Sequence, residues 1–273
     1  MKLLTTFLTW ALALGAFDAG AATLLGADGS GGNPSSLMRI DPATGSVLEV
    51  IGAIEDAGGN GIAVTGLAVS PLDGKLYASQ ANAQGRNLYE IDPATGAATL
   101  VGSLDNGFTE TAADLSFGPD GTLYGWFEAG TDDLHSIDTS TGMPTLVGDA
   151  GLSTACAGLV VNSASTALMF DCFQMHEISL LDGSVLSTTS ISGTFNDVGL
   201  GVDIDPMTGT LYAIEKTSQT ERNLLTVDAL GNVTVVGATA ARLDALVFVP
   251  EPAMLALLGS GLLALALRGG RPR

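Results

Sequence analysis

Short apolar runs separated by turn residues follow one another along most of the chain, and one pattern returns several times. In RIDPATGSVLEVIG (39–52) and NLYEIDPATGAATLVG (87–102), Ile or Val alternates with polar residues on both sides of a turn. The Pro after Asp fixes φ for the turn, and Gly takes the position that needs a positive φ. Each segment therefore predicts a strand, a turn and a second strand.

Three further segments carry the same hairpin pattern with increasing divergence: DLHSIDTSTGMPTLVG (133–148), LLTVDALGNVTVVG (224–237) and MHEISLLDGSVLSTTS (175–190). A second hairpin, with an apolar strand, a Pro/Asp/Gly turn and a Leu-Tyr strand, precedes each later copy. Its copies are GLAVSPLDGKLYAS (66–79), DLSFGPDGTLYGW (114–126), GVDIDPMTGTLYAIE (201–215) and the degenerate GLVVNSASTALMFDC (158–172). Two hairpins make a unit of four strands.

The spacing of these units predicts the fold. The Asp of the Ile-Asp-Pro position recurs at intervals of 51, 46, 41 and 49 residues, at Asp41, Asp92, Asp138, Ser179 and Asp228. Four strands every 40–50 residues is the period of a β-propeller blade. A β-solenoid usually has shorter coils, and a β-sandwich does not repeat in this way. The sequence thus predicts an all-β propeller.

The first unit lacks its first strand, and the missing strand lies at the other end of the core. ATLLGAD (22–28) occupies the place of the Leu-Tyr strand, while DALVFVP (244–250) aligns with GLAVSP (66–71). We therefore expect residues 244–249 to pair beside 22–28 and to close a ring of five four-stranded blades over 22–249. Such closure pairs both chain ends and leaves fewer exposed edges.

The N-terminus has the layout of a secretory signal peptide. Lys2 precedes an apolar stretch from Leu3 to Phe17, and small residues follow at Ala19–Ala22. We expect a signal helix in 1–21 that is cleaved on export. An N-terminal membrane anchor is the alternative, and the shortness of the apolar run disfavours it.

The C-terminal 250–273 tail combines three features. Pro250, Glu251 and Pro252 precede an apolar run of 15 residues, Ala253–Leu267, and a basic cluster follows, namely Arg268, Arg271 and Arg273. As a helix the run would span roughly 22 Å, less than the roughly 30 Å hydrocarbon core of a bilayer. Arginines after the run favour a cytoplasmic end. The tail therefore predicts a short transmembrane helix at 253–267 that holds the exported chain temporarily.

This order of motif, short span and arginines resembles the PEP-CTERM sorting signal of Gram-negative bacteria. The match covers about 25 residues, and GGRPR replaces a denser run of arginines. The resemblance implies processing by an exosortase, a membrane protease. It also implies transient attachment to the inner membrane, followed by release to the cell surface or into an extracellular polysaccharide and biofilm setting.

Charge narrows the range of partners. The ten basic residues include Lys2 and the three tail arginines, and the 29 acidic ones include Asp18 and Glu251, so the core keeps 6 basic and 27 acidic residues, or −21. This surface repels phosphate backbones and disfavours nucleic acid as a partner. It suits solubility outside the cell, and it could also attract cations or basic partners.

Few residues suggest catalysis or metal binding. The two histidines, His135 and His176, share one repeat slot with Met38, Tyr89 and Leu225, which indicates packing. No HExxH, GxSxG, CxxC or Walker sequence occurs. The Ile-Asp-Pro aspartates are expected to cap their own turns. Calcium is the alternative, with Asp203/Asp205 and Asp132/Asp133 as adjacent carboxylates, but no complete calcium loop is present and we predict no metal and no cofactor.

The two cysteines predict a disulfide. Cys156 and Cys172 are equidistant from Ala164, at the centre of the NSAST (162–166) turn, so they face each other across two antiparallel strands. Export places them in an oxidising compartment. Two buried thiols acting as small apolar groups are the alternative.

These features predict an exported, exosortase-sorted, non-catalytic propeller with a binding or matrix role toward polysaccharide or a surface protein. One alternative is a lyase or hydrolase that acts on extracellular polysaccharide. The other is a calcium-dependent adhesive module. Propeller folds serve many functions, so the fold alone does not choose among these.

Overall fold

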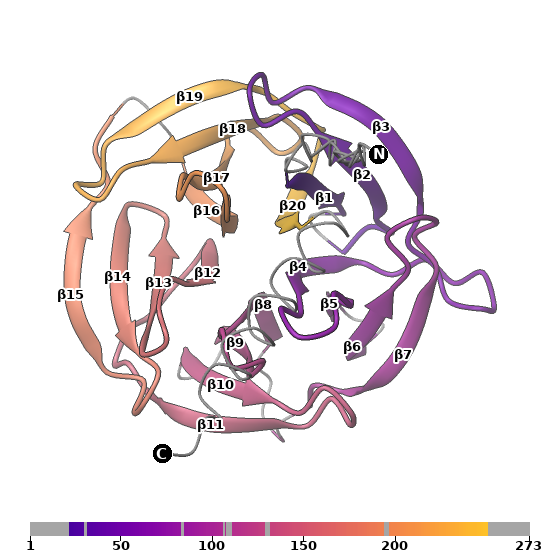
Figure 1. Cartoon of the computed structure of the whole chain (residues 1–273), viewed down its shortest axis with the longest axis horizontal. Coiled ribbons are helices and arrows are strands. Elements are labelled where there is room, and N and C mark those ends of the chain that lie inside the picture. The colour runs from indigo at the N-terminus through magenta and orange to yellow at the C-terminus, as the bar shows by residue number, and fades with distance from the viewer. Residues whose placement is uncertain are drawn as a thin grey trace, which may run out of the picture. The chain divides into compact units, whose positions relative to one another are not determined.

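Five four-stranded antiparallel sheets surround a central axis as the blades of a propeller (Figure 1). The structure is a computed structural model, and it describes residues 22–250 except 30–31, 83–84, 106, 108–110, 129–131 and 194–196. Residues Ala22–Pro250 form one compact unit. No helix able to cross a membrane occurs within these described residues. The predicted signal helix in 1–21 and transmembrane helix at 253–267 lie outside them.

Each blade runs from an inner strand beside the axis to an outer strand on the circumference. Blade 1 contains β20 (Leu243–Val249), β1 (Thr23–Asp28), β2 (Ser36–Ile40) and β3 (Val47–Ala53). Blade 2 contains β4 (Val64–Val69), β5 (Leu76–Asn82), β6 (Gly85–Ile91) and β7 (Ala98–Ser103). Blade 3 contains β8 (Thr111–Phe117), β9 (Leu123–Glu128), β10 (Asp133–Ile137) and β11 (Pro144–Asp149). Blade 4 contains β12 (Ala157–Val161), β13 (Thr166–Asp171), β14 (Gln174–Ser179) and β15 (Val185–Ser190), and blade 5 contains β16 (Asp197–Ile204), β17 (Leu211–Lys216), β18 (Arg222–Val227) and β19 (Val233–Ala238).

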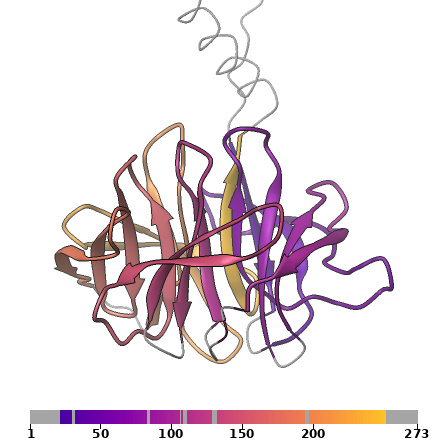
Figure 2. The ribbon, with the colours of Figure 1, turned by 90° about the horizontal axis from the view of Figure 1, so that it is seen from below.

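The last strand closes the ring as predicted. β20 pairs antiparallel with β1, in a register that begins at Thr23 and Val249. Alternate residues of β20 face the two neighbouring blades because successive side chains in a strand point to opposite sides. Val247 packs with residues of blade 2, and Leu246 and Phe248 pack with residues of blade 5. Figure 2 shows β20 (yellow) beside the strands of blade 1 (indigo).

The Ile-Asp-Pro turns are capped as the sequence predicts. Asp41 accepts hydrogen bonds from the backbone N–H of Ala43 (2.9 Å) and from Oγ1 of Thr44 (2.8 Å). Equivalent bonds occur at Asp92, Asp138 and Asp228, and at Ser179, whose Oγ accepts the N–H of Leu181. Hydrogen bonds within the turns lower the pKa of three of these carboxyls, with the largest effect from the N–H of Ala43 at Asp41, from the side chain of Ser140 at Asp138 and from the side chain of Asn232 at Asp228. The repeated aspartates therefore act within their own turns.

The same turns also join neighbouring blades. The Gly that ends a turn lies against the outer strand of the preceding blade, so a Cβ on Gly142 would lie 2.9 Å from the carbonyl oxygen of Gly102. Gly45 meets Gly237 in the same way, which connects blade 5 to blade 1. The recurring Thr-Gly and Val-Gly pairs of the repeat therefore allow close backbone contact between blades.

Candidate functional site at the channel mouth

A pocket of about 360 Å³ lies where the C-terminal ends of the inner strands meet. Each of β4, β8, β12, β16 and β20 contributes to its wall at one repeat position, with Val69, Phe117, Val161, Ile204 and Phe248. The wall is thus largely apolar, and it is formed jointly by all five blades. We call this end of the propeller the channel mouth, and the face around it the mouth face.

Prolines mark the rim of the pocket at a second repeat position. Pro71, Pro119, Pro206 and Pro250 line it, and Ser163 takes this place in blade 4. Each Pro follows an inner strand and has no N–H to leave unpaired there. The sequence placed Pro250 in the sorting motif and also aligned it with Pro71 at the end of the repeat segment. In the structure it is the rim residue of blade 1.

Two carboxylates, the buried Asp114 and the partly buried Asp203, hold the inner strands together. Asp114 in β8 accepts N–H bonds from Leu115 (2.9 Å), from Leu159 in β12 (3.0 Å) and from Val202 in β16 (3.4 Å). Burial nevertheless raises its pKa well above the usual value. The side chain therefore joins three blades. Sequence reasoning missed it, although a charged residue in an otherwise apolar strand was an available signal.

Asp203 in β16 has a similar role in blade 5, two blades further along the chain. Its Oδ1 accepts the N–H of Ile204 (2.8 Å), and its Oδ2 accepts the N–H of Phe248 in the closing strand (2.6 Å). Burial raises its pKa to about 7. Asp205, the next carboxylate along the chain, caps the turn after β16 through the N–H of Met207. Asp203 and Asp205, the pair considered for calcium, therefore bond to different parts of the backbone: Asp203 to the closing strand and Asp205 to its own turn.

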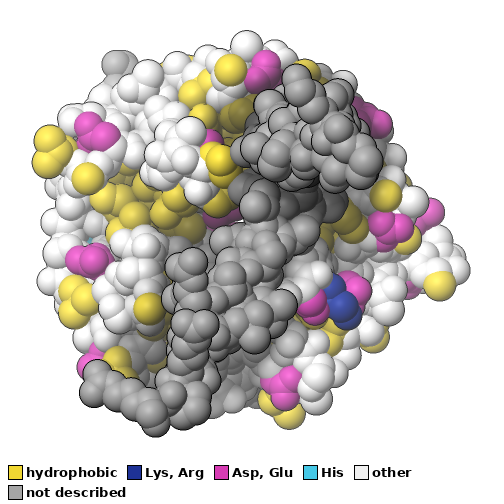
Figure 3. Space-filling view, viewed as in Figure 1, with side chains coloured by type: hydrophobic (Ala, Val, Ile, Leu, Met, Phe, Trp, Pro, Cys, Tyr) yellow, Lys and Arg dark blue, Asp and Glu magenta, His cyan; other side chains and the backbone are white. Residues whose placement is uncertain are grey.

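Exposed apolar side chains surround the pocket. Leu72, Met143, Leu181, Met207 and Leu230 lie in turns and are 48% to 88% exposed. These turns connect first to second strands or third to fourth strands, and in an antiparallel blade both kinds of turn lie at the same end. Figure 3 shows apolar (yellow) and acidic (magenta) side chains alternating around the ring, with few basic ones (dark blue).

The predicted disulfide lies at the opposite end of blade 4. Cys156 and Cys172 are bonded, with Cα atoms 5.3 Å apart. The strands between them pair from Ala157 with Asp171 to Val161 with Ala167, so the register is centred on Ala164 as predicted. Both cysteines have a left-handed backbone, with φ of 68° and 43°, a conformation that non-glycine residues seldom adopt.

Three carboxylates hold the segment that carries Cys156. Glu128 accepts bonds from Oγ1 of Thr154 and from the N–H of Ala157, both at 3.2 Å. Asp132 accepts the N–H of Thr154, and Asp171 accepts the N–H of Ala155. Burial raises the pKa of Glu128. Asp132, considered from sequence for calcium, therefore helps to fix the backbone that leads to the disulfide.

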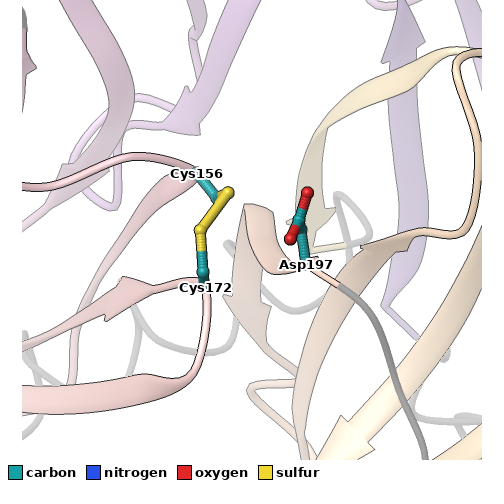
Figure 4. A group of neighbouring side chains, drawn as sticks. All are labelled: Cys156, Cys172 and Asp197. Carbon is teal, nitrogen blue, oxygen red and sulfur yellow. A yellow bond between two sulfur atoms is a disulfide. The ribbon is translucent and has the colours of Figure 1, made fainter.

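Asp197 of blade 5 lies next to the disulfide (Figure 4). Its carboxylate and the two sulfur atoms are within 4.8 Å of one another. The N–H of Val198 donates to the carbonyl of Cys172 (3.2 Å), which links the two blades here. Because the sulfurs are bonded to each other, they offer no thiolate to a metal. The group therefore acts as a structural link.

The histidines lie in the repeat slot assigned to them. His135 and His176 pair with Leu146 and Thr188 of the outer strands, as Met38, Tyr89 and Leu225 pair with Val50, Leu100 and Val235. All five are buried. His135 also contacts the ring of Phe127, with centroids 4.4 Å apart. Neither histidine lines the channel mouth.

Comparisons with known proteins agree with this architecture. A protein of unknown function from Bacteroides caccae has a TM-score of 0.53 at 11% identity, over 85% of this chain and 100% of that chain. A chain of a nidogen/laminin complex also has a TM-score of 0.53 at 11% identity, over 84% of this chain and 98% of that chain. At this identity the similarity shows the fold alone. No curated protein matches the chain in sequence.

Two families match the sequence itself. The PEP-CTERM protein-sorting motif matches residues 248–271. It identifies an exported chain that is processed by an exosortase and delivered to the cell surface or the extracellular space. The second match covers residues 16–171, more than half of the chain. The chain therefore belongs to the family described as "Repeat of unknown function (DUF6923)".

Proposed function

We propose that this chain is a non-catalytic binding protein of the cell surface or extracellular matrix, and that its mouth face binds another protein. The observation that carries this proposal is the set of exposed apolar side chains around the pocket, which includes Leu72, Leu181 and Leu230. Exposed apolar groups gathered around a depression are typical of protein interaction sites.

The chemistry of the pocket supports binding without catalysis. Asp203 is the one ionisable residue among the described residues that line it. Both of its oxygens already accept backbone N–H bonds. General acid–base catalysis needs a titratable group within hydrogen-bond reach of the substrate. A carboxylate that holds two strands together does not offer such a group to a bound molecule.

The side-chain types favour a protein partner over polysaccharide. Leu and Met at the turn tips bury area against another apolar surface, whereas a polysaccharide offers mainly hydroxyl groups that need hydrogen-bond partners. The core charge of −21 further favours a partner with basic residues around its apolar centre.

Retention of the full chain at the surface of exosortase-producing cells tests the proposal. We expect Leu72→Ser/Leu181→Ser/Leu230→Ser to be released into the medium. The control Leu100→Ser/Leu146→Ser/Val235→Ser removes three exposed apolar groups, each 50% to 58% exposed, from the circumference and should be retained. Equal retention of both variants would contradict a role for the mouth face. Release of the unmodified chain by polysaccharide-degrading enzymes alone would assign a polysaccharide ligand instead.

A further inference from the structure

The sorting motif and the ring-closing strand share residues. The motif match begins at Phe248, whereas β20 extends to Val249. Phe248 is buried, and Val249 pairs with Thr23. Pro250 then lines the channel mouth. The first three residues of the sorting signal are therefore part of the folded propeller.

Little chain separates the propeller from the membrane-directed run. Only Glu251 and Pro252 lie between Pro250 and Ala253. Residues 250–252 span at most about 10 Å even when fully extended. A protease that binds the motif must therefore approach within that distance of the mouth face, or it must receive residues that have left the sheet.

We infer that exosortase and ring closure compete for residues 248–250, so that release of the end of β20 controls the rate of processing. Asp203 is the group that holds this end, because its Oδ2 accepts the N–H of Phe248 at 2.6 Å. Local opening of a terminal strand segment needs less free energy than global unfolding, so it can occur in the native propeller. The inference depends on the sorting route and not on the proposed protein partner.

The repeat provides a matched pair of variants. Asp203 and Ser116 occupy the same position relative to Pro206 and Pro119. The Oγ of Ser116 accepts the N–H of Val161 (2.9 Å), the equivalent bond between blades 3 and 4. Asp203→Ala therefore removes the side-chain bond to the closing strand, while Ser116→Ala removes the corresponding bond elsewhere in the ring.

The experiment follows conversion of the full precursor to its processed form in exosortase-producing cells, by pulse-chase. Loss of the hydrogen bond between Asp203 and Phe248 should raise the open population, so we expect Asp203→Ala to be processed about tenfold faster. Ser116→Ala should match the unmodified chain. Equal rates for these two variants would overturn the inference.

A second variant keeps the test independent of overall stability. A flexible Gly-Ser linker inserted between Val249 and Pro250 separates the strand from the rest of the motif. We expect fast processing of this chain, with no further increase when Asp203→Ala is added. An unchanged rate after insertion would overturn the competition. Absence of any processing in the unmodified chain would instead contradict the sorting route itself.

Discussion

Gly45 in blade 1 lies directly against Gly237 in blade 5. A Cβ on Gly45 would be 2.9 Å from the carbonyl oxygen of Gly237, and φ at Gly45 is +76°. The contact is the last of a series between neighbouring blades, and it joins residues that are distant in sequence. Ring closure therefore depends on backbone contact at the circumference as well as on strand pairing near the axis.

Gly45→Ala should destabilise the propeller by more than its backbone conformation alone explains. Gly209→Ala is the matched control, since Gly209 has a similar φ of +71° and a Cβ there would have no atom within 4 Å. We expect the control to lose about 1 kcal/mol. Gly45→Ala should lose about 1–3 kcal/mol more because the neighbouring backbone must shift. Urea unfolding measures both, and equal losses would contradict the contact.

Removal of the closing strand should destabilise the core strongly. A chain of residues 22–252 keeps β20, whereas a chain of 22–242 lacks it. Leu246, Val247 and Phe248 are at most 5% exposed, and burial of each such side chain contributes roughly 1.5–3 kcal/mol. Their combined loss is a large share of a typical stability of about 5–15 kcal/mol. Thermal melts compare the two chains, and equal melting temperatures would show that 243–249 is only a linker.

The disulfide should be complete in material from the periplasm. Cys156 and Cys172 should not react with thiol labels in the unfolded chain until a reductant is added. The bond has a sequence separation of 16 residues, and a loop of this size predicts a stabilisation of about 3 kcal/mol. Cys156→Ser/Cys172→Ser should lose that amount in urea unfolding. Ready labelling of unfolded, unreduced protein would contradict the bond.

Stability should rise as the pH falls from neutral. The pKa of Asp203 is raised from 3.8 to about 7, so the native state holds a proton that the unfolded chain releases. The contribution of Asp203 to the free energy of unfolding is present below pH 3.8 and is lost as the pH rises through about 7. Asp203→Asn should flatten this dependence, as measured by urea unfolding between about pH 5 and pH 8. An unchanged slope would contradict a raised pKa at Asp203.

A different group of carboxylates should limit stability in acid. The pKa of Asp228 is lowered by hydrogen bonds from Asn232. Its contribution is therefore present above the ordinary pKa and is lost as the pH falls through the lowered value. Asp228→Asn should change the acid limb of the stability profile and leave the slope near neutral pH unchanged. If Asp228→Asn changed the slope near neutral pH as much as Asp203→Asn does, the pH dependence of stability near neutrality would not come from Asp203.

The locally repeated parts of this protein could be predicted from the sequence. The Ile-Asp-Pro turns and the Leu-Tyr strands predicted five blades because each hairpin is encoded within a continuous segment. The alignment of 244–250 with 66–71 predicted closure, since a missing strand in one unit must be supplied elsewhere. The equal distances of Cys156 and Cys172 from Ala164 predicted their pairing because a hairpin register is symmetric about its turn.

The contacts that join the blades, and the place where a ligand could bind, depend on the three-dimensional closure of the ring. Asp114 bonds to residues 45 and 88 positions away, and no local pattern indicates which backbone donors it meets. The channel mouth combines one position from each of five blades, so it exists only when the ring is closed. The sequence aligned Pro250 with Pro71 and placed it in the sorting signal, but it lines the pocket only because β20 returns to the first blade.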